Sequence, residues 1–189
     1  MSEIKEARLQ KANSLINKGF ASYAESFKVS HTTKILVEKF DHLENGQEEE
    51  FRVSIAGRVM ARRVMGKIAF FTISDQEGQI QLYLDKSIVN SNLENQKLLT
   101  FEDIKEIVDI GDWIGVFGTI KKTNKGELSI KVERWEMLSK SLQPLPDKWH
   151  GLTDIEKRYR QRYLDLIVNP HSKNVFKTRA KCISFIRKW

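Results

Sequence analysis

The stretch from Gly57 to Leu84, GRVMARRVMGKIAFFTISDQEGQIQLYL, constrains the fold of this chain more than any other part. In three segments within it, side chains of one kind recur at every second residue, and a period of two is typical of β-strands. Short turns separate the segments, and Gly66 can adopt the positive φ of a tight hairpin. The stretch therefore predicts strands at 53–60, 67–74 and 79–84. One face of the first strand should carry Ile55, Gly57, Val59 and Ala61.

The predicted sheet carries side chains that suit unpaired nucleic-acid bases. Phe70 and Phe71 lie in the middle strand, and two arginines precede the first turn. An exposed ring can stack on a base, arginine neutralises phosphate, and Gln81 can donate and accept at a base edge. Each residue alone has an ordinary explanation, since one ring of such a pair usually packs in the core and charged pairs are usually solvated. Their combination on one small sheet favours a nucleic-acid-binding surface.

The rest of the first 140 residues predicts helices around further strands. We expect helices at 4–18, 33–42 and 92–108, a polar loop at 45–50, and strands at 112–121 and 127–138. Gly19 should end the first helix, and Asn124-Lys125-Gly126 should turn between the last two strands. Five strands with a helix between the third and the fourth is the order of the OB-fold barrel, which binds oligonucleotides on strands two and three.

The C-terminal part of the chain differs in composition. Two of the three prolines lie between Ser141 and Gly151, which predicts a linker. Beyond it we expect a helix over 153–166 that begins at Thr153 or Asp154 and is broken by Asn169-Pro170. A second helix should start at Ser172 or Asn174. Its apolar side chains are spaced for burial, namely Val175, Phe176, Ile183 and Ile186.

Composition excludes several classes of protein. No apolar run approaches the ~20 residues of a membrane span, and the N-terminus lacks the apolar core of a signal peptide. Cys182 is the only cysteine, so an internal disulfide or a cysteine cluster for zinc cannot form. We expect a cytoplasmic location and no membrane partner.

Net charge is +7, but it is unevenly placed. Residues 148–189 hold 11 of the 32 Lys and Arg and 3 of the 25 Asp and Glu, which leaves 21 against 22 in residues 1–147. The basic excess therefore lies outside the predicted base-binding sheet, and the whole-chain charge is no argument for binding there.

Three blocks carry a family resemblance: AGRVMARRVMGKIAFFTISDQEGQIQLYL, KTNKGELSI and PLPDKWHGLTDIEKRYRQRYLDLIVNP. Together they resemble the N-terminal part of class II lysyl-tRNA synthetases of the bacterial kind. The resemblance implies a mainly β chain with flanking helices (α+β), built on a five-stranded OB-fold barrel. The implied domains are a helical extension at 1–50, the anticodon-binding domain at 51–140, a linker at 141–152, and at 153–189 a truncated start of the catalytic domain with an incomplete motif 1 helix.

The resemblance also implies four anticodon-binding residues. Phe70 matches a position that stacks on the central uridine, and Gln81 and Glu127 match positions that hydrogen-bond uridine edges. Arg63 matches a position that holds a base or the backbone. An amide and a carboxylate suit a uridine edge, which presents two acceptors and a donor. We expect no catalytic residue and no metal ligand in this chain.

By the same resemblance the full enzyme is a homodimer that forms lysyl-adenylate from lysine and ATP with Mg²⁺ and transfers lysine to tRNA-Lys. The ATP and lysine sites of the family lie in later motifs, so this chain alone is expected to bind neither cofactor and to be inactive. Two alternatives stay open: a stand-alone tRNA-binding module without catalysis, and a general OB-fold binder of single strands. A general binder would depend on stacking and a strongly basic groove rather than on Arg63, Gln81 and Glu127.

Overall fold

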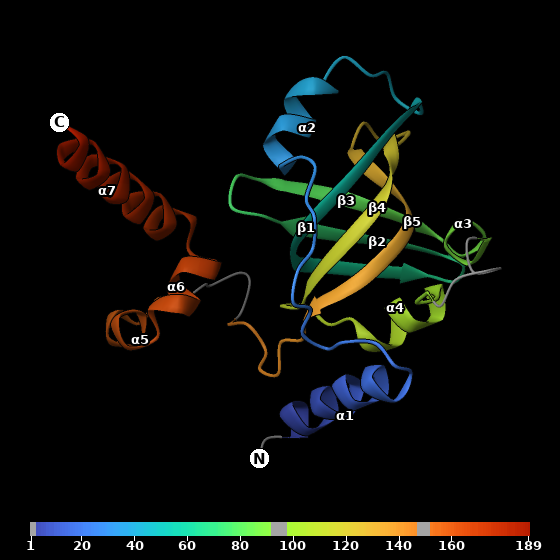
Figure 1. Cartoon of the computed structure of the whole chain (residues 1–189), viewed down its shortest axis with the longest axis horizontal. Coiled ribbons are helices and arrows are strands. Elements are labelled where there is room, and N and C mark those ends of the chain that lie inside the picture. The colour runs from blue at the N-terminus through green and yellow to red at the C-terminus, as the bar shows by residue number, and fades with distance from the viewer. Residues whose placement is uncertain (1–2, 92–97, 147–151) are drawn as a thin grey trace. The chain divides into compact units, whose positions relative to one another are not determined.

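The five strands form one closed ring in the computed structural model, which describes residues 3–91, 98–146 and 152–189 (Figure 1). The ring runs in the order β1 (Glu48–Met65), β2 (Ile68–Ser74), β3 (Gln79–Asp85), β5 (Leu128–Ser139) and β4 (Trp113–Lys122), and β4 pairs back with β1. All neighbours are antiparallel except β3 and β5, which are parallel. The prediction of a five-stranded, helix-flanked OB-fold is confirmed.

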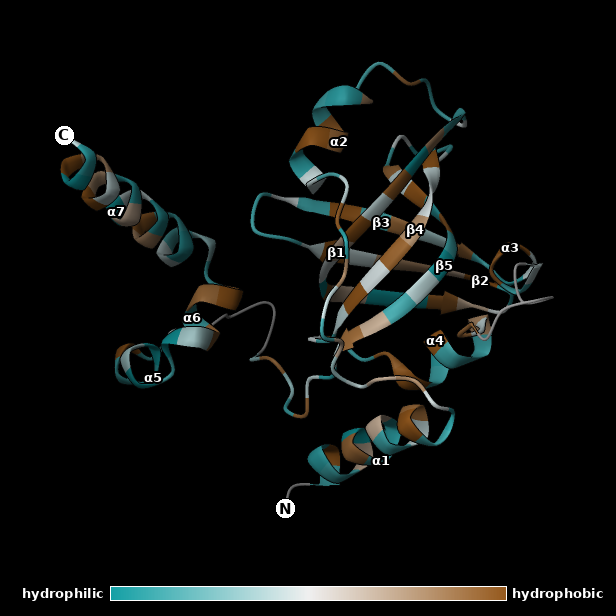
Figure 2. Cartoon of the chain, viewed as in Figure 1, coloured by the Kyte–Doolittle hydropathy of each residue, from teal (hydrophilic) through white to brown (hydrophobic). Residues whose placement is uncertain are grey.

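The core lies inside the ring because alternate residues of each strand point inward. Buried residues alternate with more exposed ones without a break along β2 and β3, and Figure 2 shows hydrophobic and hydrophilic residues following one another along β3. Phe71, Leu82 and Trp135 are among the largest fully buried side chains. The indole N–H of Trp135 donates to the Thr100 carbonyl at 3.1 Å, so the ring nitrogen is satisfied in the core.

Strand β1 differs from its prediction in two ways. It begins at Glu48, so the loop predicted at 45–50 is wrong for its last three residues. The predicted faces hold as far as Val59, which is fully buried. Between Val59 and Ala61 the pairing with β2 shifts by one residue, and such a bulge reverses the alternation that follows. Ala61 is therefore only partly buried, and Val64 packs against the core instead.

Among the described residues of this unit, the helices beside the ring are α1 (Glu3–Asn17), α2 (Thr33–Lys39), α3 (Lys86–Ser91) and α4 (Phe101–Ile107). Gly19 has a φ of 76° and ends α1 as predicted. The helix predicted at 92–108 is partly wrong, since residues 98–100 are not helical and residues 92–97 lie outside the described ranges. Helix α4 starts late because Thr100 and Asp103 form a capping box. Helix α3 was not predicted from the sequence.

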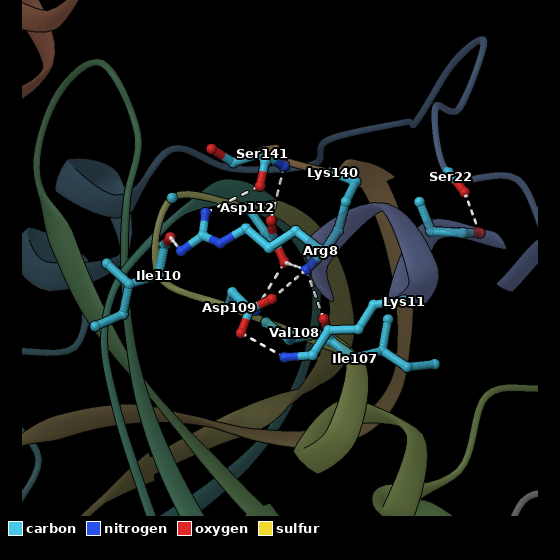
Figure 3. A network of polar contacts seen from close by, with 12 residues as sticks. Arg8, Lys11, Ser22, Ile107, Val108, Asp109, Ile110, Asp112, Lys140 and Ser141 are labelled. Carbon is cyan, nitrogen blue, oxygen red and sulfur yellow. Dashed lines mark hydrogen bonds and ion pairs between the residues drawn. The ribbon is translucent and has the colours of Figure 1, made fainter. Parts of the chain in front are cut away.

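A polar network fixes α1 to the end of β5 (Figure 3). The ammonium group of Lys140 is fully buried and donates to the carboxylates of Asp109 and Asp112 at 2.7 Å each. Arg8 of α1 donates to the Ser141 carbonyl at 2.9 Å. Buried charges persist in folded proteins when they are paired and hydrogen-bonded, so this network sets the place where the chain leaves the ring.

A strap at residues 24–31 covers part of the outer surface of β1 and β4. Its backbone bonds to β1, with the Ser30 N–H donating to the Ser54 carbonyl at 2.8 Å. The ring of Phe27 lies 5.1 Å from that of Phe117, centroid to centroid. Phe27 also sits against Gly115, where an added Cβ would lie 2.3 Å from the ring. The strap therefore covers the ring around Ser54, Gly115 and Phe117.

The structure divides into two units, Met1–Gln143 and Pro144–Trp189, and this division falls within the predicted linker. The predicted domain bounds themselves stay predictions. The second unit contains α5 (Ile155–Arg160), α6 (Arg162–Val168) and α7 (Pro170–Lys188). The single helix predicted at 153–166 is wrong, because the backbone leaves helical geometry at Gln161. Asp154 caps α5 as predicted, by accepting from the Lys157 N–H.

Asp165 holds the three helices of the second unit together. Its carboxylate is fully buried and accepts from Arg158 at 2.8 Å, Asn169 at 2.7 Å and Ser172 at 3.1 Å, and also from Arg162. Burial alone would raise the pKa of Asp165, but these bonds lower the pKa to about 2.

Within the described ranges, no helix is both long and apolar enough to cross a membrane.

Candidate nucleic-acid interface

The strand register sets two rows of side chains across the outer face of the ring. The first row crosses from β1 to β5 through Arg63, Phe70, Tyr83 and Lys131. The second crosses from β2 to β4 through Thr72, Gln81, Ser129 and Lys121. Paired residues on adjacent strands point to the same face. Three of the four predicted residues, Arg63, Phe70 and Gln81, therefore share one surface, which we call the reading face.

Phe70 is half-buried at the centre of the first row. Its ring centroid lies 5.6 Å from that of Tyr83, and the two rings are tilted by 59°. The ammonium group of Lys121 lies 4.7 Å from the centroid of the Tyr83 ring, a distance typical of a cation–π contact. The Tyr83 ring thus packs against the Phe70 ring, while the Lys121 ammonium group lies over the Tyr83 ring. Of the two rings, Phe70 is therefore the better candidate for stacking on a base.

The bulge in β1 separates the two arginines that the sequence places together. Arg62 donates to the carbonyls of Val108 at 2.5 Å and Lys105 at 2.7 Å, and so satisfies backbone carbonyls at the C-terminal end of α4. Arg63 is exposed and lies opposite Phe70 in the register. Of the two, only Arg63 is therefore placed to meet a ligand on the reading face.

Gln81 and Glu127 meet directly. The Gln81 Nε2 donates to a Glu127 carboxylate oxygen at 2.5 Å, and the Ser129 hydroxyl donates to the Gln81 Oε1 at 2.8 Å. A carboxylate only accepts hydrogen bonds, so these partners fix the amide in one orientation. The amide keeps one N–H and one lone pair for a ligand. Glu127 precedes β5 and is exposed, whereas Ser129 is fully buried.

A pocket of about 350 Å³ adjoins this pair. Val37 and Phe40 line it from the side of α2, and Gln81, Lys122 and Glu127 line it from the strands and the β4–β5 turn. Its volume lies within the usual range of small-ligand sites. The pocket combines an apolar wall with a donor, a cation and a carboxylate, which suits a planar polar ring.

The start of α2 is fixed to the β2–β3 turn. The Asp75 carboxylate accepts from the Thr33 N–H at 2.7 Å and from its hydroxyl at 2.8 Å. Burial alone would raise the pKa of Asp75, but these bonds and those from the Gly78 and Glu77 backbone keep it below its usual value. The charged carboxylate therefore anchors the wall of the pocket at neutral pH.

Sequence reasoning missed three kinds of residue at this face: the orienting hydroxyl of Ser129, the supporting ring of Tyr83, and the charged cluster of Glu48, Lys121 and Lys131. Strand alternation could have placed Ser129 and Lys131 on the outer face, because Ile130 and Val132 are the buried residues between and beside them. No local signal places them next to Gln81 and Tyr83, since that contact depends on the parallel pairing of β3 with β5. A role in base binding for the four predicted residues stays a prediction.

Both the ring and the whole chain are similar to known proteins. Residues 53–138 match the family described as "OB-fold nucleic acid binding domain". The chain is 89% identical to the lysine–tRNA ligase of Prochlorococcus marinus (strain MIT 9312) and 56% identical to that of Synechococcus sp. (strain CC9902). Each comparison covers the whole of this chain and 37% of the relative. The family resemblance is thereby confirmed: over its full length, this chain is similar to the N-terminal 37% of lysine–tRNA ligases, and its residues 53–138 form an OB-fold nucleic acid binding domain.

Proposed function

We propose that this chain is the tRNA-recognition part of a lysine–tRNA ligase and that its reading face binds anticodon bases of tRNA-Lys. The observation that carries the proposal is the convergence of Arg63, Phe70, Gln81 and Glu127 on one surface of the ring. The full-length similarity to lysine–tRNA ligases supplies the identity of the RNA.

Each residue has a distinct part in this proposal. Phe70 stacks on the central base, and a base–aromatic stack is worth about 1–3 kcal/mol. Gln81 offers one N–H donor and one acceptor in a fixed orientation, and Glu127 accepts from an imino N–H. Arg63 supplies positive charge to a base edge or a phosphate at the end of the row. Stacking thus supplies affinity, and the amide and carboxylate supply the preference for uridine.

For the whole enzyme we propose activation of lysine with ATP and Mg²⁺, followed by transfer to tRNA-Lys, in the cytoplasm. By the family resemblance, later motifs hold the nucleotide, the metal and lysine, and residues 153–189 begin the catalytic domain. We also propose a homodimer whose interface includes α7. In support, Phe185 and Ile186 of that helix are 71% and 69% exposed, a large apolar area for a helix surface.

A stand-alone tRNA-binding module is the second candidate, because the ring by itself matches a nucleic-acid-binding family. The similarity to ligases continues through the second unit, which such a module does not require, and this favours the ligase.

The test is a binding titration of the tRNA-Lys anticodon stem-loop against a stem-loop with the same stem and three substituted anticodon bases. Both titrations use one salt concentration, since salt alone changes such affinities widely. We expect the cognate loop to bind more tightly by at least tenfold. Equal affinities for the two loops would contradict anticodon reading.

A further inference from the structure

A cluster of three charged residues lies beside the reading face and has no part in the proposed base reading. Glu48 of β1 contacts two lysines: its Oε1 lies 2.7 Å from the Lys121 Nζ and its Oε2 lies 2.5 Å from the Lys131 Nζ. Each carboxylate oxygen thus takes one ammonium group. The lysine side chains are 23% and 27% exposed, so a ligand can reach them although they are held in place.

The two lysines continue the two rows of the reading face. Lys131 lies next to Tyr83 in the first row, two strands from Phe70. Lys121 lies next to Ser129 in the second row, two strands from Gln81. Adjacent strands are about 5 Å apart, so each lysine backbone lies about 10 Å from the base-contacting residue of its row. A strand of RNA with one base on Phe70 would pass these ammonium groups with its backbone.

The charge balance gives such a local contact weight. Residues 1–147 have slightly more acidic than basic residues, so their net charge does not attract a phosphate backbone. A local pair of ammonium groups can hold the two free oxygens of one phosphodiester in the way that they hold the two oxygens of the Glu48 carboxylate. In the free protein the carboxylate therefore occupies the position that suits a phosphate.

We propose that Lys121 and Lys131 form a binding subsite for an RNA phosphodiester, which Glu48 fills in the free protein and leaves when RNA binds. The subsite rests on the proposed anticodon-reading function, because a base on Phe70 brings the backbone to the lysines. It adds affinity without sequence preference, since a phosphate carries no base information. Glu48 in turn lowers the affinity for every RNA that uses the subsite, because its two ion pairs must break before the phosphate binds.

A purely structural role makes a different prediction. If Glu48 only ties β1 to β4 and β5, its removal lowers the melting temperature and leaves RNA binding unchanged or weaker. If Glu48 competes with phosphate, Glu48→Gln binds RNA more tightly, by about two- to fivefold, the change expected on freeing surface ion pairs. The direction of the change in affinity therefore separates the two roles.

The experiment is a titration of the cognate stem-loop at several KCl concentrations with Lys121→Gln, Lys131→Gln and Glu48→Gln. Lys86→Gln is the matched control, because Lys86 also pairs with a glutamate, Glu102, and lies outside both rows. We expect the Lys121 and Lys131 variants each to lower the slope of log affinity against log salt, by up to about 0.7, the value for the one phosphate contact that the two lysines share on a single strand. Lys86→Gln should leave the slope unchanged.

The proposal is overturned if either the Lys121 or the Lys131 variant keeps the wild-type slope, or if Glu48→Gln binds no more tightly than wild type. The same titrations with the anticodon-substituted loop keep this result apart from the proposed function. Loss of base preference would overturn anticodon reading, whereas the changes in slope should be equal for both loops.

Discussion

In the proposed anticodon reading, single hydrogen bonds decide which base edges the reading face can bind. The Gln81 amide could bind a base edge in either of two orientations, and its partners select one of them: the Ser129 hydroxyl faces Oε1 and the Glu127 carboxylate faces Nε2. The remaining N–H and the carboxylate together match an edge with an acceptor beside a donor, as in uridine. Replacing a donor by an acceptor in the base would leave a buried group unpaired, which is the usual source of strong discrimination.

The first prediction at this scale concerns stacking. Phe70→Ala should weaken binding of the cognate stem-loop by about 1–3 kcal/mol, and by a similar amount for any central base, because every base has a π-face. Phe70→Tyr is the matched control, since it keeps the aromatic ring and should stay near wild type. Isothermal titration at one salt concentration measures both. Wild-type affinity in Phe70→Ala would mean that the ring is not a stacking platform.

The second prediction concerns the orientation of the Gln81 amide. Gln81→Ala should lower the preference for uridine over substituted bases, because it removes the edge contact. Ser129→Ala should also lower this preference while leaving affinity for a substituted loop near wild type, since the amide then keeps Glu127 as its partner but loses the hydroxyl that holds Oε1. In the Gln81→Ala background, Ser129→Ala should cause no further loss of preference. A full additional loss in that double variant would show that Ser129 acts on the fold alone.

At the scale of elements, local patterns predict the strands and non-local pairing does not follow from them. The alternation around Phe71 and Leu82 and the turn at Gly66 are local, so β2, β3 and their hairpin could be predicted. The bulge after Val59 could not, because Ala61 continues the apolar pattern and only the pairing with β2 shifts it. The resemblance named Arg63, while the bulge explains physically why Arg63 rather than Arg62 reaches the face.

The contact between Gln81 and Glu127, which we call the reading pair, could not be predicted from local patterns either. Gln81 and Glu127 are 46 residues apart, and their contact requires the parallel pairing of β3 with β5. Neither strand carries a signal for that partner, since each also pairs antiparallel with a neighbour in the ring. The sequence could therefore predict both residues by resemblance but not that they bond to each other.

The third prediction concerns the helices α5 to α7, which depend on Asp165. The pKa of Asp165 is about 2 in the folded chain against an ordinary 3.8, so the charged carboxylate stabilises the fold by about 2 kcal/mol above pH 4. Because the folded pKa is the lower one, this stabilisation is lost as pH falls from about 4 to 2. Asp165→Asn should thus lower the protection of α6 amides at pH 6, as measured by hydrogen exchange.

The difference between Asp165→Asn and the wild-type chain isolates this one carboxylate from the others that titrate in the same range. That difference should shrink as the pH approaches 2, because the wild-type carboxyl is then also neutral. Glu156→Gln is a matched control, since Glu156 forms an exposed ion pair with Arg160 that should contribute little. A difference that stays constant down to pH 2 would mean that the charge of Asp165 is not what holds the helices.

At the scale of the whole molecule, the residues proposed to recognise bases and the excess of basic residues lie in different parts of the chain. Residues 1–147 hold the proposed reading residues and have 21 basic against 22 acidic residues, while residues 148–189 have 11 basic against 3 acidic residues. Charge of one sign on a surface attracts nucleic acid without sequence preference. The second unit should therefore contribute to affinity for a long RNA, and the ring to the choice among RNAs.

The fourth prediction follows from that separation. Binding of intact tRNA-Lys should depend more steeply on salt than binding of its anticodon stem-loop, because the basic second unit can contact phosphates that the stem-loop lacks. The measurement is the slope of log affinity against log salt for the two RNAs with the same chain. Replacing Lys177 and Lys181 of α7 with Gln should lower the slope for tRNA and leave the stem-loop slope unchanged. Identical slopes for the two RNAs would contradict a role for the second unit.

The parallel contact between β3 and β5 has a consequence for the order in which the chain folds during synthesis. Strands β1 to β3 form a local meander that can pair as soon as residue 85 has left the ribosome. The contact that closes the ring waits for residues 128–139, because it joins segments far apart in sequence. Until then the edge of β3 that carries Gln81 is unpaired and exposed to neighbouring chains. The reading pair therefore comes into existence only at the last step of ring closure, and a nascent chain stalled before β5 would carry Phe70 and Gln81 without any ability to select a base.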